Sequence, residues 1–419
     1  MSSTANIAVG VAPGKKSRSG WLVVFGLLFL ASLGSLALVI KSDPGRISWP
    51  FFAANWVFLL GLSQFGIGYV AIMRICGANF SRSYYRLGEV ITLAFMPVAI
   101  IGLVLIVKYG AEDIFHWLHP AEGAHQSSWL NLDGLFWRNM VAMLAVYGIA
   151  LVYFIYGLLP DIKDSDAQSS SGLRRAMYKF LLSVKAGKDL KDIQKRLYFW
   201  SPMVLVFVAI SQTFTSWDFG MMLSEHYHST VFSMYYIIGS MFGGTAAILF
   251  LGILMARMTG NTAFFQETQV KSMGILLTAF AILWLYFFWA QFFVTWFGNL
   301  DHETGPLWKQ MYGHYAVYFW VQLICIIGIP ISTLIIARVK RTWWMMSILT
   351  LIMMAGVWLN RFLIVVTPVA DDYRPFTALG DIVITVGLFS GFMFFLYWLF
   401  NQFPMVSAWE MDGTEKSDH

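Results

Sequence analysis

About ten stretches of at least about 18 mostly apolar residues determine what this chain can fold into. They lie near 21–40, 48–75, 87–108, 135–159, 199–217, 228–256, 273–297, 313–337, 343–366 and 378–403. Each stretch is long enough, as a helix, to cross the roughly 30 Å hydrocarbon layer of a bilayer. Hydrocarbon cannot bond exposed backbone groups, so each stretch must satisfy its own peptide groups as a helix. The sequence therefore predicts an all-α polytopic membrane protein of about ten transmembrane helices.

The composition excludes several classes of function. Hydrophobic residues make up 58% and charged residues 12% of the chain, against about 45–50% and 25% in soluble domains, so lipid is an expected partner. The net charge of +5 is spread over short loops, which argues against nucleic acid as a partner. Cys76 and Cys325 offer neither a disulfide framework nor the spacing of metal ligands, and we interpret both as packing residues.

The distribution of Lys and Arg predicts the orientation. Basic residues concentrate in the leader 1–20, in the loop 160–198 and in alternate short loops. By the positive-inside rule both termini lie in the cytoplasm. We expect the membrane to be a bacterial inner (cytoplasmic) membrane. A cleaved signal peptide is the alternative for the first span, but no small-residue cleavage site precedes Lys41 and Pro44.

The spans group into two halves. Residues 61–66 and 239–244 echo each other in the second and sixth spans, which either marks a repeat or reflects two helices that use small residues for close packing. As a repeat it favours two four-helix bundles, spans 2–5 and 6–9. The predicted parts are a cytoplasmic leader (1–20), the first span (21–47), a first bundle (48–217) with the cytoplasmic loop 160–198, a second bundle (218–366), the last span (367–403) and a cytoplasmic tail (404–419).

Two loops carry features of their own. The loop 160–198 predicts an amphipathic helix near 173–197 that lies along the membrane surface. The loop 109–134 contains His116, His119 and His125. It is either a docking surface for a partner or an ordinary solvated loop.

Ionisable and amide side chains inside the spans are the candidate functional residues, since each is costly in hydrocarbon without a partner. They are Glu89, Arg138, Asp218 and Arg361, with the neutral groups Gln64, Gln212, Gln291 and Gln322. Asp218 and Arg361 lie at similar depth near the outer ends of their spans. We therefore expect them to pair, either as part of a functional site or as a structural ion pair; outward snorkelling of Arg361 is the other alternative.

A second candidate group follows the fifth span. Asp218 is followed by His226 and His228 at one outer helix junction. An acid beside imidazoles can accept and pass protons near neutral pH. The plainer interpretation is that each histidine is an ordinary interfacial polar residue.

Common cofactor motifs do not occur in the sequence. Haem needs axial ligands on facing helices, and no pair of histidines lies at bundle depth. The sequence also has no CxxC cluster, P-loop or Rossmann glycine run. We expect no cofactor to be ligated by this chain, so that any redox centre belongs to another chain.

At several stretches the sequence resembles the NrfD/PsrC family of quinone-interacting membrane subunits, and within it the subunits of alternative complex III. The stretches that carry the resemblance are 217–219, 228–232, 292–296, 358–367 and 403–410. The resemblance implies two four-helix bundles flanked by single helices and a quinol pocket near the outer face. Asp218 and Arg361 match family positions linked to that pocket, whose substrate is menaquinol or ubiquinol. The implied partners are a periplasmic iron–sulfur subunit of molybdopterin-enzyme type, a paralogous NrfD-like membrane subunit and cytochrome c subunits.

The first half departs from the quinol-oxidising pattern. The segment 102–108 has no histidine where that subunit has one, and Arg138 and Asn139 stand where it has an aspartate. These features resemble the paired second NrfD-like subunit, thought to move protons, whereas the second half resembles the quinol-binding subunit. Both roles stay open, and Arg138, Asn139, His226, His228, Gln64 and Glu89 are candidates for a quinol or proton path.

Two other functions remain as alternatives. A secondary transporter also fits ten spans and a repeat, because Pro97, Pro330 and the glycines at 239, 243 and 244 could break helices in mid-membrane. The other alternative is a scaffold that anchors a peripheral enzyme without a quinol site. Uptake into proteoliposomes by the isolated chain, dependent on Asp218, would favour the transporter. In a scaffold, Asp218→Asn and Arg361→Leu should leave quinol turnover near that of the parent.

Overall fold

The computed structural model describes residues 17–42, 47–119, 127–224, 227–259 and 266–412, and within them it is all-helical. Ten helical segments of this part are long and apolar enough to cross a membrane, as predicted. In chain order they are α2 (Ser17–Ser42), α3 (Trp49–Ile75), α4 (Tyr85–Tyr109), α6 (Leu132–Leu158), α9 (Leu190–Asp218), α10 (Phe232–Thr259), α11 (Glu267–Gly298), α13 (Ala316–Leu323) continued by α14 (Ile329–Leu334), α16 (Trp343–Val369) and α17 (Leu379–Gln402).

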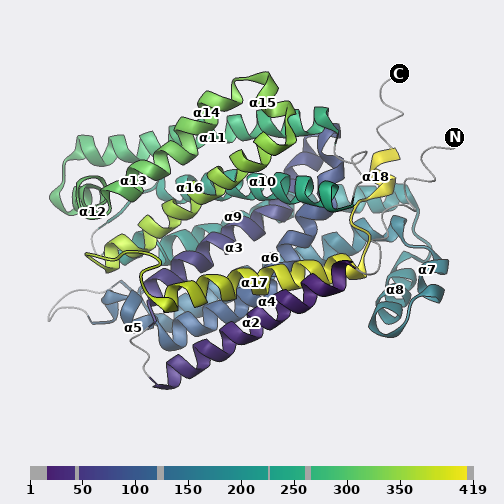
Figure 1. Ribbon diagram of the computed structural model, residues 1–419, viewed down its shortest axis with the longest axis horizontal. Coiled ribbons are helices and arrows are strands. Elements are labelled where there is room, and N and C mark those ends of the chain that lie inside the picture. The colour runs from purple at the N-terminus through teal and green to yellow at the C-terminus, as the bar shows by residue number, and fades with distance from the viewer. Residues whose placement is uncertain (1–16, 43–46, 120–126, 225–226, 260–265, 413–419) are drawn as a thin grey trace.

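Shorter helices lie at the two ends of this bundle (Figure 1). They are α5 (Ala111–Ile114), α7 (Asp164–Ser169), α8 (Gly172–Lys185), α12 (Asp301–Tyr312), α15 (Ala337–Arg341) and α18 (Ala408–Asp412). α5 and α12 lie at one end, and α7, α8 and α18 at the other. We call these the α12 end and the α18 end.

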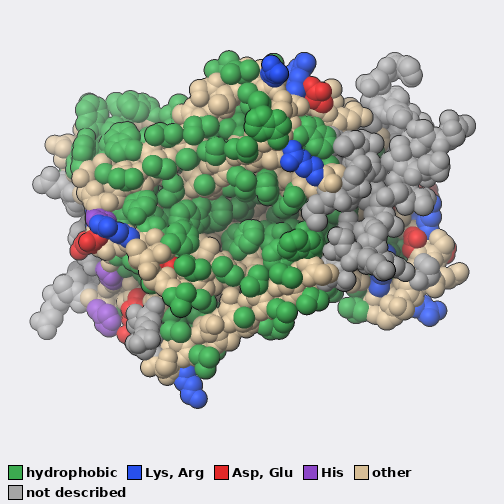
Figure 2. All heavy atoms as spheres, in the orientation of Figure 1, with side chains coloured by type: hydrophobic (Ala, Val, Ile, Leu, Met, Phe, Trp, Pro, Cys, Tyr) green, Lys and Arg blue, Asp and Glu red, His purple; other side chains and the backbone are tan. Residues whose placement is uncertain are grey.

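The helix contacts are consistent with the predicted two bundles. α3, α4, α6 and α9 contact one another in a ring, and so do α10, α11, the α13–α14 segment and α16. α3 packs against both α10 and α16, which joins the two rings, while α17 packs on α2 and α4 at one side. In Figure 2, hydrophobic side chains cover most of the middle of the visible face and charged side chains lie mostly at its margins, as expected for a lipid-facing surface.

The two glycine motifs that echo each other in the sequence meet at the boundary between the bundles. A Cβ on Gly61 of α3 would lie 2.6 Å from Ser240 Oγ of α10, and one on Gly244 would lie 2.9 Å from the Phe65 ring. Larger side chains would force α3 and α10 apart. The motifs therefore bring these two helices into close contact.

Two expectations about local structure differ from what is observed. The amphipathic helix predicted near 173–197 is α8 only, since Gly187 at φ +72° ends it and the residues from Leu190 onward belong to α9. α4 stays helical through Pro97, and α10 is continuous through its glycines. The eighth span is irregular in its middle, with a π-helix at Ile324–Gly328 before Pro330.

Candidate functional site

The Asp218 carboxylate lies at the α12 end, where it ends α9 with 1% of the residue exposed. Arg138 binds it with two hydrogen bonds, from Nε to Oδ2 at 2.7 Å and from Nη2 to Oδ1 at 2.5 Å. Asn139 Nδ2 donates to Oδ2 at 2.6 Å, and Trp129 Nε1 donates to Oδ1 at 3.2 Å. A bidentate guanidinium and two neutral donors thus compensate a buried charge.

The start of α6 positions the donors of this cluster. The side chain of Asn131 caps the helix by accepting a hydrogen bond from Gly134 N at 2.5 Å. Arg138 lies two turns further on, where its guanidinium is held over the Trp129 ring at 4.2 Å and donates to Trp129 O at 2.9 Å. The contacts with Trp129 therefore hold the guanidinium in place in addition to its bonds to Asp218.

The expectation that Arg361 pairs with Asp218 is wrong. Arg361, on α16, is 1% exposed and donates from Nη2 to Tyr236 O at 2.5 Å and to Ser240 Oγ at 3.1 Å. Its guanidinium lies over the Tyr236 ring at 3.5 Å, and no carboxylate of the described residues lies within 4.0 Å. Arg361 and Asp218 lie at similar depth but are not paired, because Arg138 on the adjacent α6 binds the Asp218 carboxylate.

A chain of hydrogen bonds nevertheless links the two charges. The Ser240 hydroxyl, which accepts from Arg361, donates to Gln212 Oε1 at 3.0 Å. Gln212 Nε2 then donates to Gln64 Oε1 at 2.7 Å, and Gln64 Nε2 donates to Ser211 Oγ at 3.0 Å. All of these side chains are buried at the α3–α9–α10 contact.

The chain continues to the acid along α9. Thr215 Oγ1 donates to Ser211 O at 2.9 Å and lies 3.4 Å from Asn139 Oδ1, and Asn139 donates to Asp218. We call the set from Arg361 to Asp218 the polar track; its members are Arg361, Ser240, Gln212, Gln64, Ser211, Thr215, Asn139 and Asp218. It crosses from the second bundle into the first.

Glu89 belongs to a different cluster, near the α18 end. Its carboxylate lies 3.6 Å from Arg86, which also pairs with Asp161 at 3.0 Å and donates to Gly157 O at 2.8 Å. A neighbouring pair, Arg74 with Glu410, fastens the C-terminal segment to this end at 3.0 Å. The structure therefore does not bring Glu89 to the Asp218 cluster.

The predicted acid–imidazole cluster is not assembled in the described part of the chain. His228 is exposed and has no hydrogen bond to the Asp218 cluster. His226 lies outside the described residues. The described residues also contain no group of three His, Cys, Asp or Glu side chains that could hold a metal ion.

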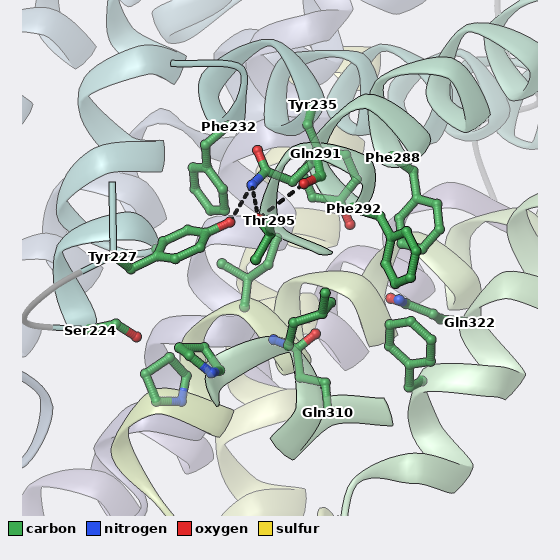
Figure 3. Close-up of a pocket in the computed structure, with 16 residues that line it drawn as sticks. Ser224, Tyr227, Phe232, Tyr235, Phe288, Gln291, Phe292, Thr295, Gln310 and Gln322 are labelled. Atoms are coloured by element: carbon green, nitrogen blue, oxygen red, sulfur yellow. Dashed lines mark hydrogen bonds between the residues drawn. The ribbon is translucent and has the colours of Figure 1, made fainter. Parts of the chain in front are cut away.

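A cavity opens beside the acid, between α10, α11, α12, α13 and α16 (Figure 3). Gly220, two residues after Asp218, lines it. Gln291 Nε2 donates to the Tyr227 hydroxyl at 2.5 Å on one wall. On another wall Tyr235 bonds Asn360, whose Oδ1 accepts from Arg361 Nη1 at 3.3 Å. The cavity is thus connected to the polar track.

Comparison with known families identifies the chain. The sequence matches the family described as polysulphide reductase, NrfD, over residues 39–370, which is most of its length. The chain belongs to the NrfD family. No curated protein matches it. NrfD proteins are membrane subunits of quinol-interacting oxidoreductase complexes and in general assemble with iron–sulfur or molybdopterin subunits.

Several members of this candidate site in the NrfD-family chain were not predicted from the sequence. Trp129 lies before the start of a span, outside the apolar stretch in which a polar group signals a site. Asn360 is a neutral residue next to the charged Arg361, which gives the stronger signal. Ser211 and Ser240 are small hydroxyl residues of a kind that usually bonds its own helix. The detectable signal was the pair Ser211 and Gln212 in mid-span, since neighbouring polar residues there need partners on other helices.

Proposed function

We propose that this chain is the NrfD-type membrane subunit of a quinol-oxidising complex of the alternative complex III type. Such a complex passes electrons from quinol to cytochrome c or another high-potential acceptor. The proposed partners are a periplasmic iron–sulfur subunit of molybdopterin-enzyme type, a paralogous NrfD-like membrane subunit and cytochrome c subunits. We place the chain in a bacterial inner membrane, and the distribution of Lys and Arg supports an orientation with the α18 end in the cytoplasm and the α12 end facing the periplasm.

The observation that carries the proposal is the polar track. Two charged groups, Arg361 and Asp218, are each buried near the α12 end and joined through fixed neutral dipoles. A buried charge is retained at such cost mainly where it acts. Oxidation of quinol releases two protons beside the electron acceptor, so fixed charges at that end suit a site where a hydroxyl must lose its proton.

The chemistry of the side chains in the track supports a positioning role. Gln64 and Gln212 are amides, which do not ionise and do not pass protons as readily as hydroxyls, water or carboxylates. The track therefore holds the two charges in position and does not by itself conduct protons across the membrane. Asp218, with Arg138 and Asn139, is the group proposed to accept the proton that leaves the quinol.

Purification of the affinity-tagged chain from its native membrane tests the proposal. We expect iron–sulfur and c-type haem signals to co-purify with quinol-dependent reduction of a high-potential acceptor. Asp218→Asn and Arg361→Gln should lower turnover by more than tenfold in assembled complex. The matched control is Asp371→Asn, an acid at the same end whose side chain is 96% exposed, and it should leave turnover unchanged.

Two results would contradict the proposal. Purification without any associated redox centre would leave the chain outside an electron-transfer complex. Normal turnover of assembled complex with Asp218→Asn and Arg361→Gln would reduce the chain to a membrane anchor. Neither result depends on whether the variants alter the amount of complex formed, because turnover is measured per assembled complex.

A further inference from the structure

A second cavity lies at the α18 end, at the opposite end of the bundle from the Asp218 cluster (Figure 1). It has a volume of about 180 Å³. Its walls come from the end of α3, the turn that follows, the start of α4, the first part of α9 and α18. Its charged and aromatic lining residues are Arg74, Arg82, Glu410, Tyr85, Tyr198 and Trp409. The cavity therefore combines charged groups with aromatic rings.

The lining carries an excess of positive charge. Two arginines, Arg74 and Arg82, stand against one acid, Glu410. Arg74 pairs with Glu410 at 3.0 Å, whereas no carboxylate of the described residues lies within 4.0 Å of the Arg82 guanidinium. An anion that enters this cavity would therefore meet a counter-charge that no described carboxylate neutralises.

Both guanidiniums have N–H groups to spare. A guanidinium can donate several hydrogen bonds in a fixed planar fork. Arg74 has one such bond to the described residues, from Nη2 to Glu410 Oε1 at 3.0 Å, and its Nε is buried without a partner among them. Arg82 donates to Asn79 Oδ1 at 2.7 Å and to Glu410 O at 3.0 Å. A phosphate group has several acceptor oxygens and matches the fork of an arginine, so it can use the remaining donors.

The position of Arg74 is fixed, and the space beside it is open. Its guanidinium carbon lies 5.1 Å from the centre of the Tyr85 ring and 5.2 Å from that of Tyr153, which are cation–π contacts. Gly77, which lines the cavity, has φ +64° and turns the chain out of α3. No atom lies within 4 Å of the place where a Cβ on Gly77 would be. The cavity thus offers a held charge next to empty space.

The cavity lies where the apolar part of α9 begins. Gln194 and Tyr198 line it from successive turns of α9. Lys191 and Lys195 lie on the same face of this helix and are exposed. Tyr198 and Phe199, at the start of the apolar stretch, are 57% and 64% exposed. Exposed aromatic residues beside basic ones are typical of the membrane interface, which is the level of lipid head groups.

We propose that this cavity binds the phosphate group of an anionic membrane lipid, with the guanidiniums of Arg74 and Arg82 as donors. Basic pockets between transmembrane helices on the cytoplasmic side suit anionic head groups, and Lys191 and Lys195 add to the attraction. A lipid is favoured over a free phosphate because the exposed apolar surface that begins at Tyr198 lies next to the site and can contact acyl chains. The site uses no member of the polar track, so it goes beyond the proposed function.

Native mass spectrometry of the full-length chain in detergent tests the site. The delipidated protein is titrated with phosphatidylglycerol, which is anionic, with phosphatidylcholine, which has no net charge, and with glycerol 3-phosphate, which has no acyl chains. We expect phosphatidylglycerol to bind most tightly. Arg82→Gln should weaken its binding about tenfold, as expected for loss of one hydrogen bond between charged groups. Arg175→Gln, which removes an exposed charge from α8 at the same end, is the matched control and should bind like the parent.

A second variant separates recognition of phosphate from a structural role of Arg82. Arg82→Lys keeps the positive charge but loses the planar fork, so it should weaken binding less than Arg82→Gln. The quantity compared is the ratio of the affinities for phosphatidylglycerol and phosphatidylcholine within each folded variant, which a general loss of stability does not change. If Arg82→Gln does not fold, a lowered ratio in Arg82→Lys supports the site and an unchanged ratio refutes it.

Three results would overturn the inference. Equal binding of phosphatidylglycerol and phosphatidylcholine would show that the charge of the head group is not recognised. Glycerol 3-phosphate binding as tightly as phosphatidylglycerol would make the ligand a soluble phosphate ester and not a lipid. Equal effects of Arg82→Gln and Arg175→Gln would show only a general attraction of anionic lipid to the basic surface at this end.

Discussion

The bond between Arg138 and Asp218 gives the sharpest prediction about stability. Arg138→Met keeps most of the length of the side chain but removes the guanidinium. The carboxylate then stays 1% exposed with only Asn139 and Trp129 as donors. Arg138 is the positively charged group among those that bind the Asp218 carboxylate. The substitution therefore leaves this buried negative charge without its counter-ion.

The magnitude follows from the environment of the pair. Breaking a buried ion pair by removing one partner costs about 3–5 kcal/mol of the free energy of unfolding. The Arg138 side chain is 13% exposed, and two neutral donors remain, so we expect about 3 kcal/mol, the lower end of that range. Asp218→Asn leaves a guanidinium that still reaches water and should cost only about 1–2 kcal/mol.

A double-mutant cycle measures the interaction. The unfolding of Arg138→Met, Asp218→Asn and the double variant is followed by tryptophan fluorescence in mixed micelles of increasing SDS content. The double variant should be more stable than Arg138→Met, with a coupling of at least about 1.5 kcal/mol. A coupling near zero, or Asp218→Asn being the more damaging single change, would refute the argument that burial makes the unpaired carboxylate costly.

Three further predictions use the same unfolding assay or proteolysis. Gly239→Ala should lower the free energy of unfolding by about 1–3 kcal/mol, because its Cβ would lie 2.9 Å from Arg361 Nη2. Gly148→Ala, whose Cβ has no atom within 4 Å, should be neutral or stabilising. Equal effects of the two substitutions would contradict this. Glu410→Gln should expose the C-terminal segment to limited proteolysis faster, since it loses the 3.0 Å pair with Arg74, and unchanged cleavage would oppose it. Trp358→Phe should cost about 1 kcal/mol through loss of the 3.0 Å bond to Asn55; a neutral result would show that water replaces the bond.

The helices could be predicted from the sequence because their cause is local. A run of apolar residues in hydrocarbon has only one way to satisfy its backbone, so the stretches near 48–75 and 343–366 became α3 and α16 almost residue for residue. The exception, the helix predicted near 173–197, depended on a single glycine in the left-handed region. Such a stop is not visible in a hydrophobic pattern.

The site was less predictable because it depends on which helices are neighbours. Depth along a span can be read from residue number, and it placed Asp218 and Arg361 at a similar level. The side of the helix and its partner cannot be read that way, so Arg138 was not recognised as the residue that binds Asp218. Gln64 and Gln212 were noted as separate polar residues, but their bond at 2.7 Å arises only from the close contact of α3, α9 and α10.

The contact at Gly61 has a consequence for motion. Transporters that work by rocking slide one bundle over the other. Here such a slide would pull Ser240 away from Gln212 and drive side chains into the Gly61 gap, which has no spare room. The two halves of this molecule are interlocked at this contact, so a rocking motion of one half over the other would first have to break it.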